Sequence, residues 1–432
     1  MIEPNTKAKT STKTSAKVDI HLCLDVGKSA TKVLYQTSSS SNPSFLMMGP
    51  EMEPIESHWL KSYLEFEGAL TSPAPEQEAY LKWNDQTYVL GHFAHRFSPE
   101  DRIEETKYEN ASFKALAAIG VIVQKETLPT KKVIRVSLAV LLPKNEYDDR
   151  FSLQERLEEM LADYEFRGQR LRVKLEKFVC KPEGFGLAMI RMREKGVDYF
   201  RNKNIGVLML GHYNCTALAF EAGAMRGESP AYGFSQMLDT VIERTSGLSR
   251  DVLATAIYKT LNKGRDYLYN KTAYVSKRPP FASYEAFQAL GRSSDPKWRE
   301  KEVDKVVQAL SLATEEYWAR LERWLKKVFP SGLQEVIISG GPSVYLKPEL
   351  EQYFNCRPKW HEGSSYQKGY WGYEAKDYQQ PWTPIVWGAG LNEQLDGFSW
   401  FRWISGKEDN ALNHRLVDCY GLFDYLMQDN NK

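Results

Sequence analysis

A module of strand, short polar loop and strand occurs twice in this chain. In residues 18–36 the apolar runs VDIHLCLD and TKVLYQ flank a loop that contains Gly27, Lys28 and Ser29. In residues 204–223 the runs NIGVLMLG and CTALAFEAG flank the loop HYN. Loops this short join antiparallel strands. The duplication therefore predicts two similar domains that face a cleft.

Helical patterns alternate with the strands. Residues 111–125 are apolar on most faces, and residues 299–328 carry a long apolar stripe. A further helix is expected after Arg150, where Ser152 and Glu155 have the spacing of a capping box. Strands that alternate with helices along the chain predict an α/β protein.

Composition excludes several classes of protein. The chain has 432 residues, which is room for two or more domains, and a net charge of +1, which gives no global attraction to nucleic acid. No apolar run reaches the roughly 18 to 20 residues of a membrane helix. The five cysteines are scattered without a C-x-x-C pair, so a disulfide framework and a zinc site are disfavoured. A cytoplasmic protein without a membrane partner is expected.

Residues 1–17 are rich in Lys, Thr and Ser and have no apolar period. Such a segment buries too little apolar surface to order itself, so a disordered tail is expected.

The loop after Asp25 has the chemistry of an anion site. A P-loop and a dinucleotide fingerprint both need a helix after their glycines, whereas here Gly27, Lys28 and Ser29 lead into a strand. What remains is a hairpin tip whose successive backbone N–H groups form an anion-binding concavity. Asp25 is placed to hold the water shell of Mg²⁺, an ion that prefers few carboxylates and several waters. An ordinary hairpin turn is the alternative.

A second candidate element is EVIISGGPSVYL at residues 335–346, a strand that runs into two glycines and a helix. Adjacent glycines allow a flat ring to lie on the backbone. An ordinary strand-to-helix turn is again the alternative.

Taken in order, these motifs resemble the actin-like ATPases of the ParM/StbA group. These are bacterial plasmid-segregating filament proteins that share the fold of actin and the sugar kinases. Asp25, Gly27, Ser29 and Lys32 match the group's first phosphate loop, D-x-G-x-(S/T)-x-x-K. Four further segments, within a resemblance that covers about residues 19–428, match in order: LPKNEYDDR (142–150), PEGFGLA (182–188), GGPS (340–343) and LVDCYGLFDYL (416–426).

The resemblance implies an α/β actin-like ATPase fold with two similar α/β domains that flank a nucleotide cleft. Domain I would span residues 18–180 and be completed by a C-terminal helix within 400–430. Domain II would span residues 181–399, with an aromatic insertion at 355–382.

The resemblance also implies that ATP or GTP binds in the cleft with Mg²⁺. Asp25 would hold the hydrated metal, and Glu183 would act in catalysis by positioning the attacking water. The other expected nucleotide-binding residues are Gly27, Lys28, Ser29, Thr31 and Lys32 in the first loop, Gly211, His212, Tyr213 and Asn214 in the second, and Gly340, Gly341 and Ser343 at the adenosine. The alternative for Lys32 is that it is an exposed strand lysine. The alternative for His212 is that it is a loop residue that faces solvent.

The second loop departs from the group's pattern, D-x-G-x-x-T-T-x. Gly211 is present, but Met209 replaces the aspartate, and Asn214 and Cys215 replace the two threonines. Because methionine cannot bind Mg²⁺, nucleotide binding is expected while hydrolysis is expected to be slow.

The leading functional prediction is a protein that polymerises with itself for plasmid or DNA segregation, or for another cytoskeletal task. An adaptor protein would make the DNA contact, since no DNA-reading motif is present. The aromatic segment 355–382 is interpreted either as a contact between protomers or as an insertion packed on its own domain. One alternative is a catalytically weak or inactive actin-like scaffold, which Met209 favours. The other is a small-molecule kinase of the same superfold, although the sequence shows no motif for a catalytic base or a sugar pocket.

Overall fold

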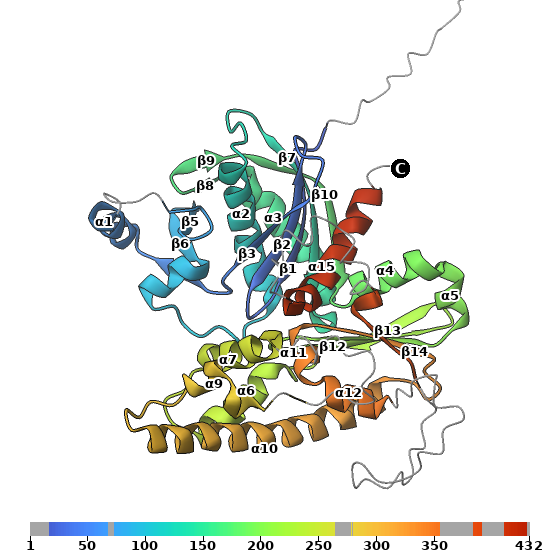
Figure 1. The fold of residues 1–432 in the computed structure, drawn as a ribbon. Coiled ribbons are helices and arrows are strands. Elements are labelled where there is room, and N and C mark those ends of the chain that lie inside the picture. The colour runs from blue at the N-terminus through green and yellow to red at the C-terminus, as the bar shows by residue number, and fades with distance from the viewer. Residues whose placement is uncertain are drawn as a thin grey trace, which may run out of the picture.

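The structure is a computed structural model, and it describes residues 17–67, 73–263, 278, 280–354, 383–390 and 410–429. The aromatic segment 355–382 and all but the last residue of the expected tail lie outside the described residues. The described part contains three five-stranded sheets, with helices around them (Figure 1).

The first sheet has the strand order β10-β7-β1-β2-β3. The strands β1, β2 and β3 form an antiparallel meander, whereas β7 and β10 add to β1 in parallel. The bounds are β1 (Ile20–Val26), β2 (Thr31–Thr37), β3 (Ser44–Met48), β7 (Ile134–Leu142) and β10 (Val173–Pro182). β1 and β2 form the first predicted hairpin, and β3 is a further apolar run, SFLMM.

The second sheet repeats this pattern in the order β13-β12-β11-β14-β15. Here β11, β12 and β13 are antiparallel, and β14 and β15 add in parallel. The bounds are β11 (Ile205–Leu210), β12 (Cys215–Glu221), β13 (Ala224–Glu228), β14 (Glu335–Ser339) and β15 (Ile385–Trp387). The duplication predicted from the two hairpins is thus confirmed at the level of strand order.

The third sheet lies beside the first and is antiparallel, in the order β4-β6-β5-β8-β9. The bounds are β4 (Met52–Ile55), β5 (Ala79–Trp83), β6 (Gln86–Leu90), β8 (Tyr164–Phe166) and β9 (Gln169–Leu171). Helix α1 (Ser57–Glu67) lies between β4 and β5 in the chain, and a 3₁₀ helix (Gly91–Phe97) follows β6.

Helices fill the remaining described segments. In the first half these are α2 (Lys107–Lys125), α3 (Arg150–Ala162) and a 3₁₀ helix (Lys144–Asp149). The others are α4 (Phe185–Lys195), α5 (Val197–Asn202), α6 (Phe234–Arg244), α7 (Arg250–Lys263), α9 (Glu285–Gln288), α10 (Pro296–Val328), α11 (Gly341–Tyr345), α12 (Lys347–Tyr353), α15 (Asn410–Asp429) and the 3₁₀ helices Phe281–Ser283 and Gly388–Gly390.

The capping box expected in α3 is wrong. The helix begins at Arg150, so Ser152 and Glu155 lie inside it, and its N-cap Asp149 makes no side-chain cap hydrogen bond. The residues before Ser152 continue from the preceding 3₁₀ helix directly into α3, which leaves no free helix end for Ser152 to cap.

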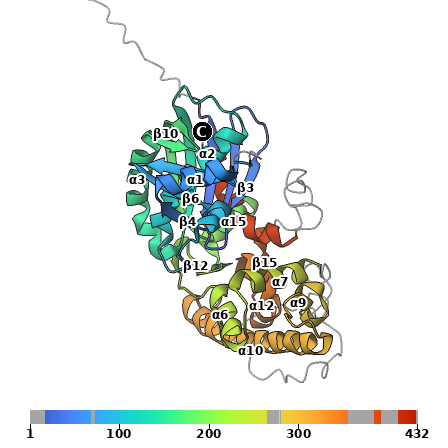
Figure 2. The same ribbon diagram turned by 90° about the vertical axis from the view of Figure 1, so that its left-hand side faces the viewer.

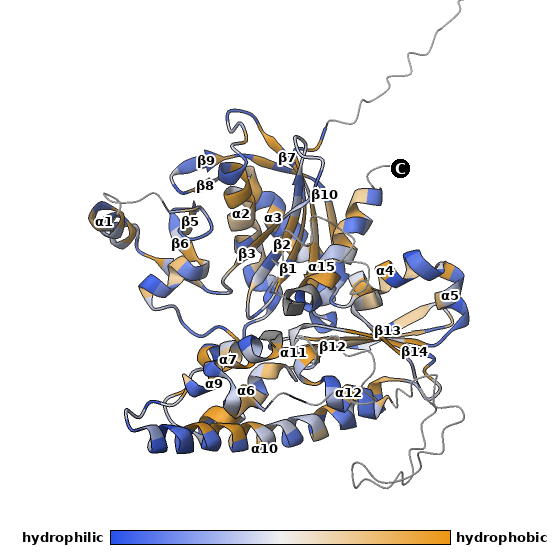
Figure 3. Ribbon diagram, in the orientation of Figure 1, coloured by the Kyte–Doolittle hydropathy of each residue, from blue (hydrophilic) through white to orange (hydrophobic). Residues whose placement is uncertain are grey.

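Each half has its own large apolar core. One packs β1 and β7 against α2 and α3, and the other packs β11 against α6 and α10. Figure 2 shows α10 along the outer edge of the second half, and Figure 3 shows apolar residues along the strands and a mixed surface on α10. No helix in the described ranges is long and apolar enough to cross a membrane.

Helix α15 connects the two halves. It contacts β1, β2 and β7 of the first sheet and crosses α4, which precedes the second sheet in the chain. The crossing is made at two glycines. A Cβ on Gly186 would lie 1.9 Å from the carbonyl oxygen of Asp418, and a Cβ on Gly421 would lie 2.1 Å from the carbonyl oxygen of Gly186. Only glycine fits at either position.

We expect Gly421→Ala to lower the free energy of unfolding by about 1–3 kcal/mol, because the new methyl group must push two helix backbones apart. Urea unfolding followed by circular dichroism measures the change. Gly341→Ala is the matched control, since its Cβ would meet its nearest neighbour, Arg415 Cγ, at 3.4 Å, an ordinary contact. Equal effects of the two substitutions would contradict a tight helix crossing.

Candidate functional site

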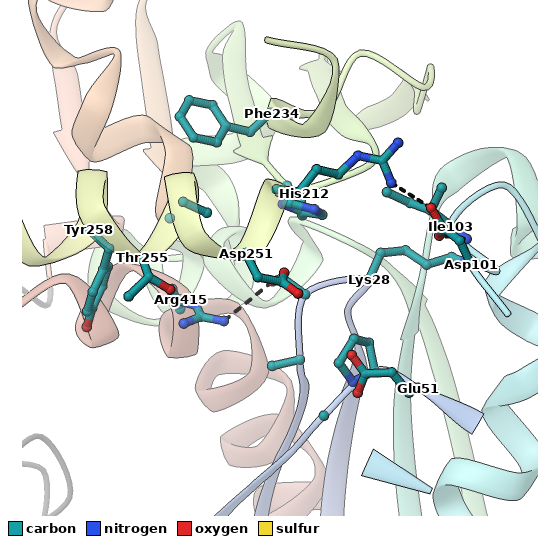
Figure 4. Close-up of a pocket in the computed structure, with 18 of the residues that line it drawn as sticks. Lys28, Glu51, Asp101, Ile103, His212, Phe234, Asp251, Thr255, Tyr258 and Arg415 are labelled. Carbon is teal, nitrogen blue, oxygen red and sulfur yellow. Dashed lines mark hydrogen bonds and ion pairs between the residues drawn. The ribbon is translucent and has the colours of Figure 1, made fainter. Parts of the chain in front are cut away.

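A cavity of about 990 Å³ lies between the two halves (Figure 4). Residues of both hairpin loops line it, together with residues of α2, α7, α11 and α15. In Figure 4, Lys28 and Asp101 of the first half lie across the cavity from Thr255 and Tyr258 of α7. Each half therefore contributes a wall.

The two hairpin loops have the same tight geometry. A Cβ on Gly27 would lie 2.6 Å from the carbonyl oxygen of Ala30, and a Cβ on Gly211 would lie 2.6 Å from that of Asn214. Either clash would force the turn open, so both positions require glycine. The agreement shows that the repeat extends from strand order to loop conformation.

Strand register places Asp25 opposite Lys32 in the first hairpin and Met209 opposite Thr216 in the second. Lys32 is buried and donates a hydrogen bond to Asp25 Oδ2. The alternative of an exposed strand lysine is therefore wrong. In the second hairpin a methionine and a threonine occupy the positions of this ion pair.

Glu183 lies behind the cavity wall, and both of its carboxylate oxygens accept hydrogen bonds. Lys107, the first residue of α2, pairs with Glu183 Oε1, and Thr216 Oγ1 donates to Glu183 Oε2 at 3.3 Å. Burial lowers the pKa of Lys107, but the charges of Glu183 and Asp25 outweigh it, and the net shift is upward. Lys107 therefore carries a positive charge beside both carboxylates.

Asp418 of α15 binds the N-terminus of α4. Its carboxylate accepts hydrogen bonds from the backbone N–H groups of Gly184 at 2.6 Å and Leu187 at 3.2 Å. Burial raises the pKa of Asp418 to about 7, and the charges of Asp25 and Glu183 add to this, while the two N–H groups oppose it. This contact holds the backbone next to Glu183.

The donor set near the cavity does not fit the expected magnesium ion. Lys32 occupies one oxygen of Asp25, Lys107 and Thr216 occupy both oxygens of Glu183, and Met209 offers no oxygen. Throughout the ranges that the structure describes, no group of three or more His, Cys, Asp or Glu residues could hold a metal ion. A metal at Asp25 is disfavoured, because the ammonium groups of Lys32 and Lys107 already pair with Asp25 and Glu183.

Further lysines face the cavity. Lys28 Nζ donates to the carbonyl oxygen of Arg102 at 2.6 Å, and burial lowers its pKa to about 8. Lys114 of α2 lines the cavity, is only 5% exposed and has no hydrogen bond or ion pair among the described residues. Neither ammonium group has a carboxylate at hydrogen-bond distance among the described residues, although Glu51 and Asp101 line the same cavity.

Sequence reasoning missed Lys107 and Lys114. Both lie on α2, two turns apart and hence on one face, in a helix whose middle is otherwise apolar. Two basic residues on one face of a buried helix were the available signal, because a buried lysine needs a partner or a ligand.

The adenosine motif forms a sharp turn. Gly340 has φ +101°, and its Cβ would lie 2.0 Å from the carbonyl oxygen of Leu210. Gly341 lines the cavity, whereas Ser343 is buried and donates to the carbonyl oxygen of Gly340 at 2.7 Å. Beside this turn, Arg415 Nη2 of α15 donates to Ser29 Oγ at 3.4 Å, which links α15 to the first loop.

The structure thus brings part of the predicted set to the cavity wall: Lys28, Ser29, Lys32, Gly211, His212 and Gly341. Behind the wall or within the turns lie Asp25, Gly27, Thr31, Glu183, Tyr213, Asn214, Gly340 and Ser343. Thr31 Oγ1 and Asn214 Oδ1 are buried without a hydrogen-bond partner.

His212 lines the cavity rather than facing open solvent. Burial lowers its pKa to about 4, so the imidazole is neutral at pH 7 and offers hydrogen bonds without charge.

No protein-family model and no curated protein sequence matches this chain. Among solved structures, Bacillus thuringiensis ParM with ADP is 10% identical, with a TM-score of 0.53 over 94% of this chain and 98% of that one. Bacillus thuringiensis ParM with AMPPNP is 10% identical, with a TM-score of 0.52 over 96% of this chain and 100% of that one. The chain has a ParM-type actin-like fold, in which two similar α/β domains flank a cleft.

Lys114 makes the stability of the protein depend on pH. Burial and the ammonium groups of Lys28 and Lys107 lower the pKa of Lys114 from 10.5 to about 7. The carboxylates of Glu51 and Glu105 act in the opposite direction but are outweighed. Between these values the unfolded chain binds more protons than the folded one, so this residue makes stability rise with pH. We expect Lys114→Met to be more stable than the parent by roughly 2–4 kcal/mol at pH 7.

Urea unfolding of both proteins from about pH 7 to about pH 10 measures this difference, which should shrink as the pH rises. Lys125→Met is the control, because Lys125 lies on the same helix, is exposed and pairs with Glu76. A difference that stays constant across the range would contradict a buried, unpaired Lys114.

Proposed function

We propose that this chain is a nucleotide-binding, actin-like protein that assembles into filaments, and that ATP or GTP in the cleft controls assembly. The observation that carries the proposal is the pair of glycine-constrained hairpin loops that line one cavity from its two sides. Such loops present backbone N–H groups, which suit phosphate oxygens. The same fold was solved with ADP and with AMPPNP in a Bacillus thuringiensis relative.

The nucleotide would lie with its phosphates between the two loops. The backbone of Gly27 to Ser29 and of Gly211 to Tyr213 would bind them, with Lys28 and Lys32 supplying charge. The base and sugar would lie toward Gly341, where the absence of a side chain leaves room for a ring. Arg415 is placed between this region and Ser29, so it would contact either part of the ligand.

Closure of the cleft would couple the ligand to assembly. The ion pair between Arg250 of α7 and Asp101 of the first half, 2.7 Å apart, already joins the two walls. A ligand that binds both loops favours a closed arrangement over an open one, and a filament contact can recognise that change. Segregation of plasmid or other DNA in the cytoplasm, through an adaptor protein that makes the DNA contact, is the task that the motif resemblance supports.

Hydrolysis is proposed to be slow. Met209 supplies no carboxylate where the first hairpin has Asp25, and Glu183 is held by Lys107 and Thr216. Phosphoryl transfer depends on positioning and electrostatics, so the loss of one charge slows turnover without removing the binding site. A second candidate function, a scaffold that binds nucleotide without turnover, is favoured by the same residue.

High-speed sedimentation tests the assembly proposal. We expect the purified full chain to pellet with ATP and magnesium and to stay in the supernatant without nucleotide. Gly211→Val, which would open the second loop, should abolish the response because its side chain collides with the carbonyl oxygen of Asn214. A parent protein that stays soluble with every nucleotide, while still binding it, would contradict filament control.

Met209→Asp tests the account of slow turnover. We expect phosphate release to rise by about tenfold, since a carboxylate at this position can orient water and adds charge next to Thr216. Met209→Asn is the matched control, because it is polar but carries no charge. If the aspartate variant releases phosphate no faster than the asparagine variant, the missing carboxylate does not limit the rate and the scaffold function gains support.

A further inference from the structure

We infer that this cleft binds the phosphates of a nucleotide without a divalent cation, because lysine side chains of the chain itself supply the positive charge. The inference rests on the proposed function, namely that a nucleotide binds in this cavity. It assigns to Lys114 a role in phosphate binding that the motif resemblance does not contain.

The first step concerns the acids that a hydrated metal would need. Asp25 pairs with Lys32, and Glu183 pairs with Lys107; all four side chains are buried. A divalent cation brought to these acids would have to break buried ion pairs and would be repelled by two ammonium groups at short range. The arrangement therefore disfavours a metal at this place.

The second step concerns the charge that remains for a ligand. Lys28 and Lys114 line the cavity without a carboxylate at hydrogen-bond distance, and Lys114 has no hydrogen-bond or ion-pair partner among the described residues. A buried ammonium group without an anion at hydrogen-bond distance is costly, because burial removes most of its hydration. A polyphosphate is a ligand of matching charge, and its oxygens form strong charge-assisted hydrogen bonds with ammonium groups.

The third step concerns position. Lys114 interacts electrostatically with Lys28, which belongs to the first hairpin loop, and with Lys107, which adjoins Glu183. Lys28 and Lys114 thus belong to one cavity wall and influence each other, while Lys107 lies behind that wall. Neutral His212 and Gly211 line the same cavity from the second half.

The test is the affinity of the full chain for a fluorescent ATP with a methylanthraniloyl label on its ribose, measured with magnesium and again with excess EDTA. We expect the two dissociation constants to agree within about threefold. Binding that weakens about tenfold or more in EDTA overturns the inference while leaving the proposed function intact. Absence of binding in both buffers overturns the proposed function, and the inference falls with it.

The second arm uses Lys114→Met in EDTA. We expect its affinity for the labelled ATP to fall by about tenfold, because one charged contact to phosphate is lost. Lys125→Met, on the exposed end of the same helix, should bind as the parent does. Loss of affinity in a variant that is more stable than the parent cannot result from unfolding. Parent-like affinity of Lys114→Met in EDTA overturns the role of this residue.

Discussion

The close crossing of α4 and α15 fixes the geometry on which the rest of the cleft depends. Gly186 and Gly421 allow the two backbones to meet, and Asp418 binds the free N–H groups at the start of α4. A carboxylate at a helix N-terminus is stabilised by the helix dipole, which offsets part of the cost of its burial. Because Glu183 directly precedes α4, the same contact sets the position of Glu183 against Lys107.

Charge is arranged in layers around the cavity. Behind the wall, Asp25 and Glu183 each pair with a buried lysine, and the charges of both acids help raise the pKa of the buried Asp418. Removing one partner of such a buried pair costs far more stability than the intact pair contributes. Asp25 and Glu183 are therefore expected to stay paired with their lysines. At the wall itself, Lys28 and Lys114 are left without carboxylates within hydrogen-bond distance. An anion bound as proposed would give these two ammonium groups a direct partner.

The hairpins β1–β2 and β11–β12 of the two central sheets followed from the sequence because apolar runs and short polar loops determine hairpins locally. In the third sheet the sequence predicts only one strand, QTYVLG at residues 86–91, which corresponds to β6. The other strands of this sheet are short and partly exposed and give weak alternation. The pairing of Lys107 with Glu183 joins residues 76 positions apart, and such contacts depend on how helices pack rather than on any local pattern. Lys114 was missed for another reason, since the apolar residues around it in the sequence made the whole helix look apolar.

The two loops of the internal repeat share a turn but differ in the side chains beside it. In the first hairpin the register pair is Asp25 with Lys32, and in the second it is Met209 with Thr216. The glycine turns are the same in both, so backbone N–H groups are offered from both sides, while only the first hairpin carries an ion pair between its strands. If a nucleotide binds here as proposed, its phosphates would contact lysines of the first domain and backbone N–H groups of both loops. The approach of the second domain to such a ligand would then couple binding to assembly.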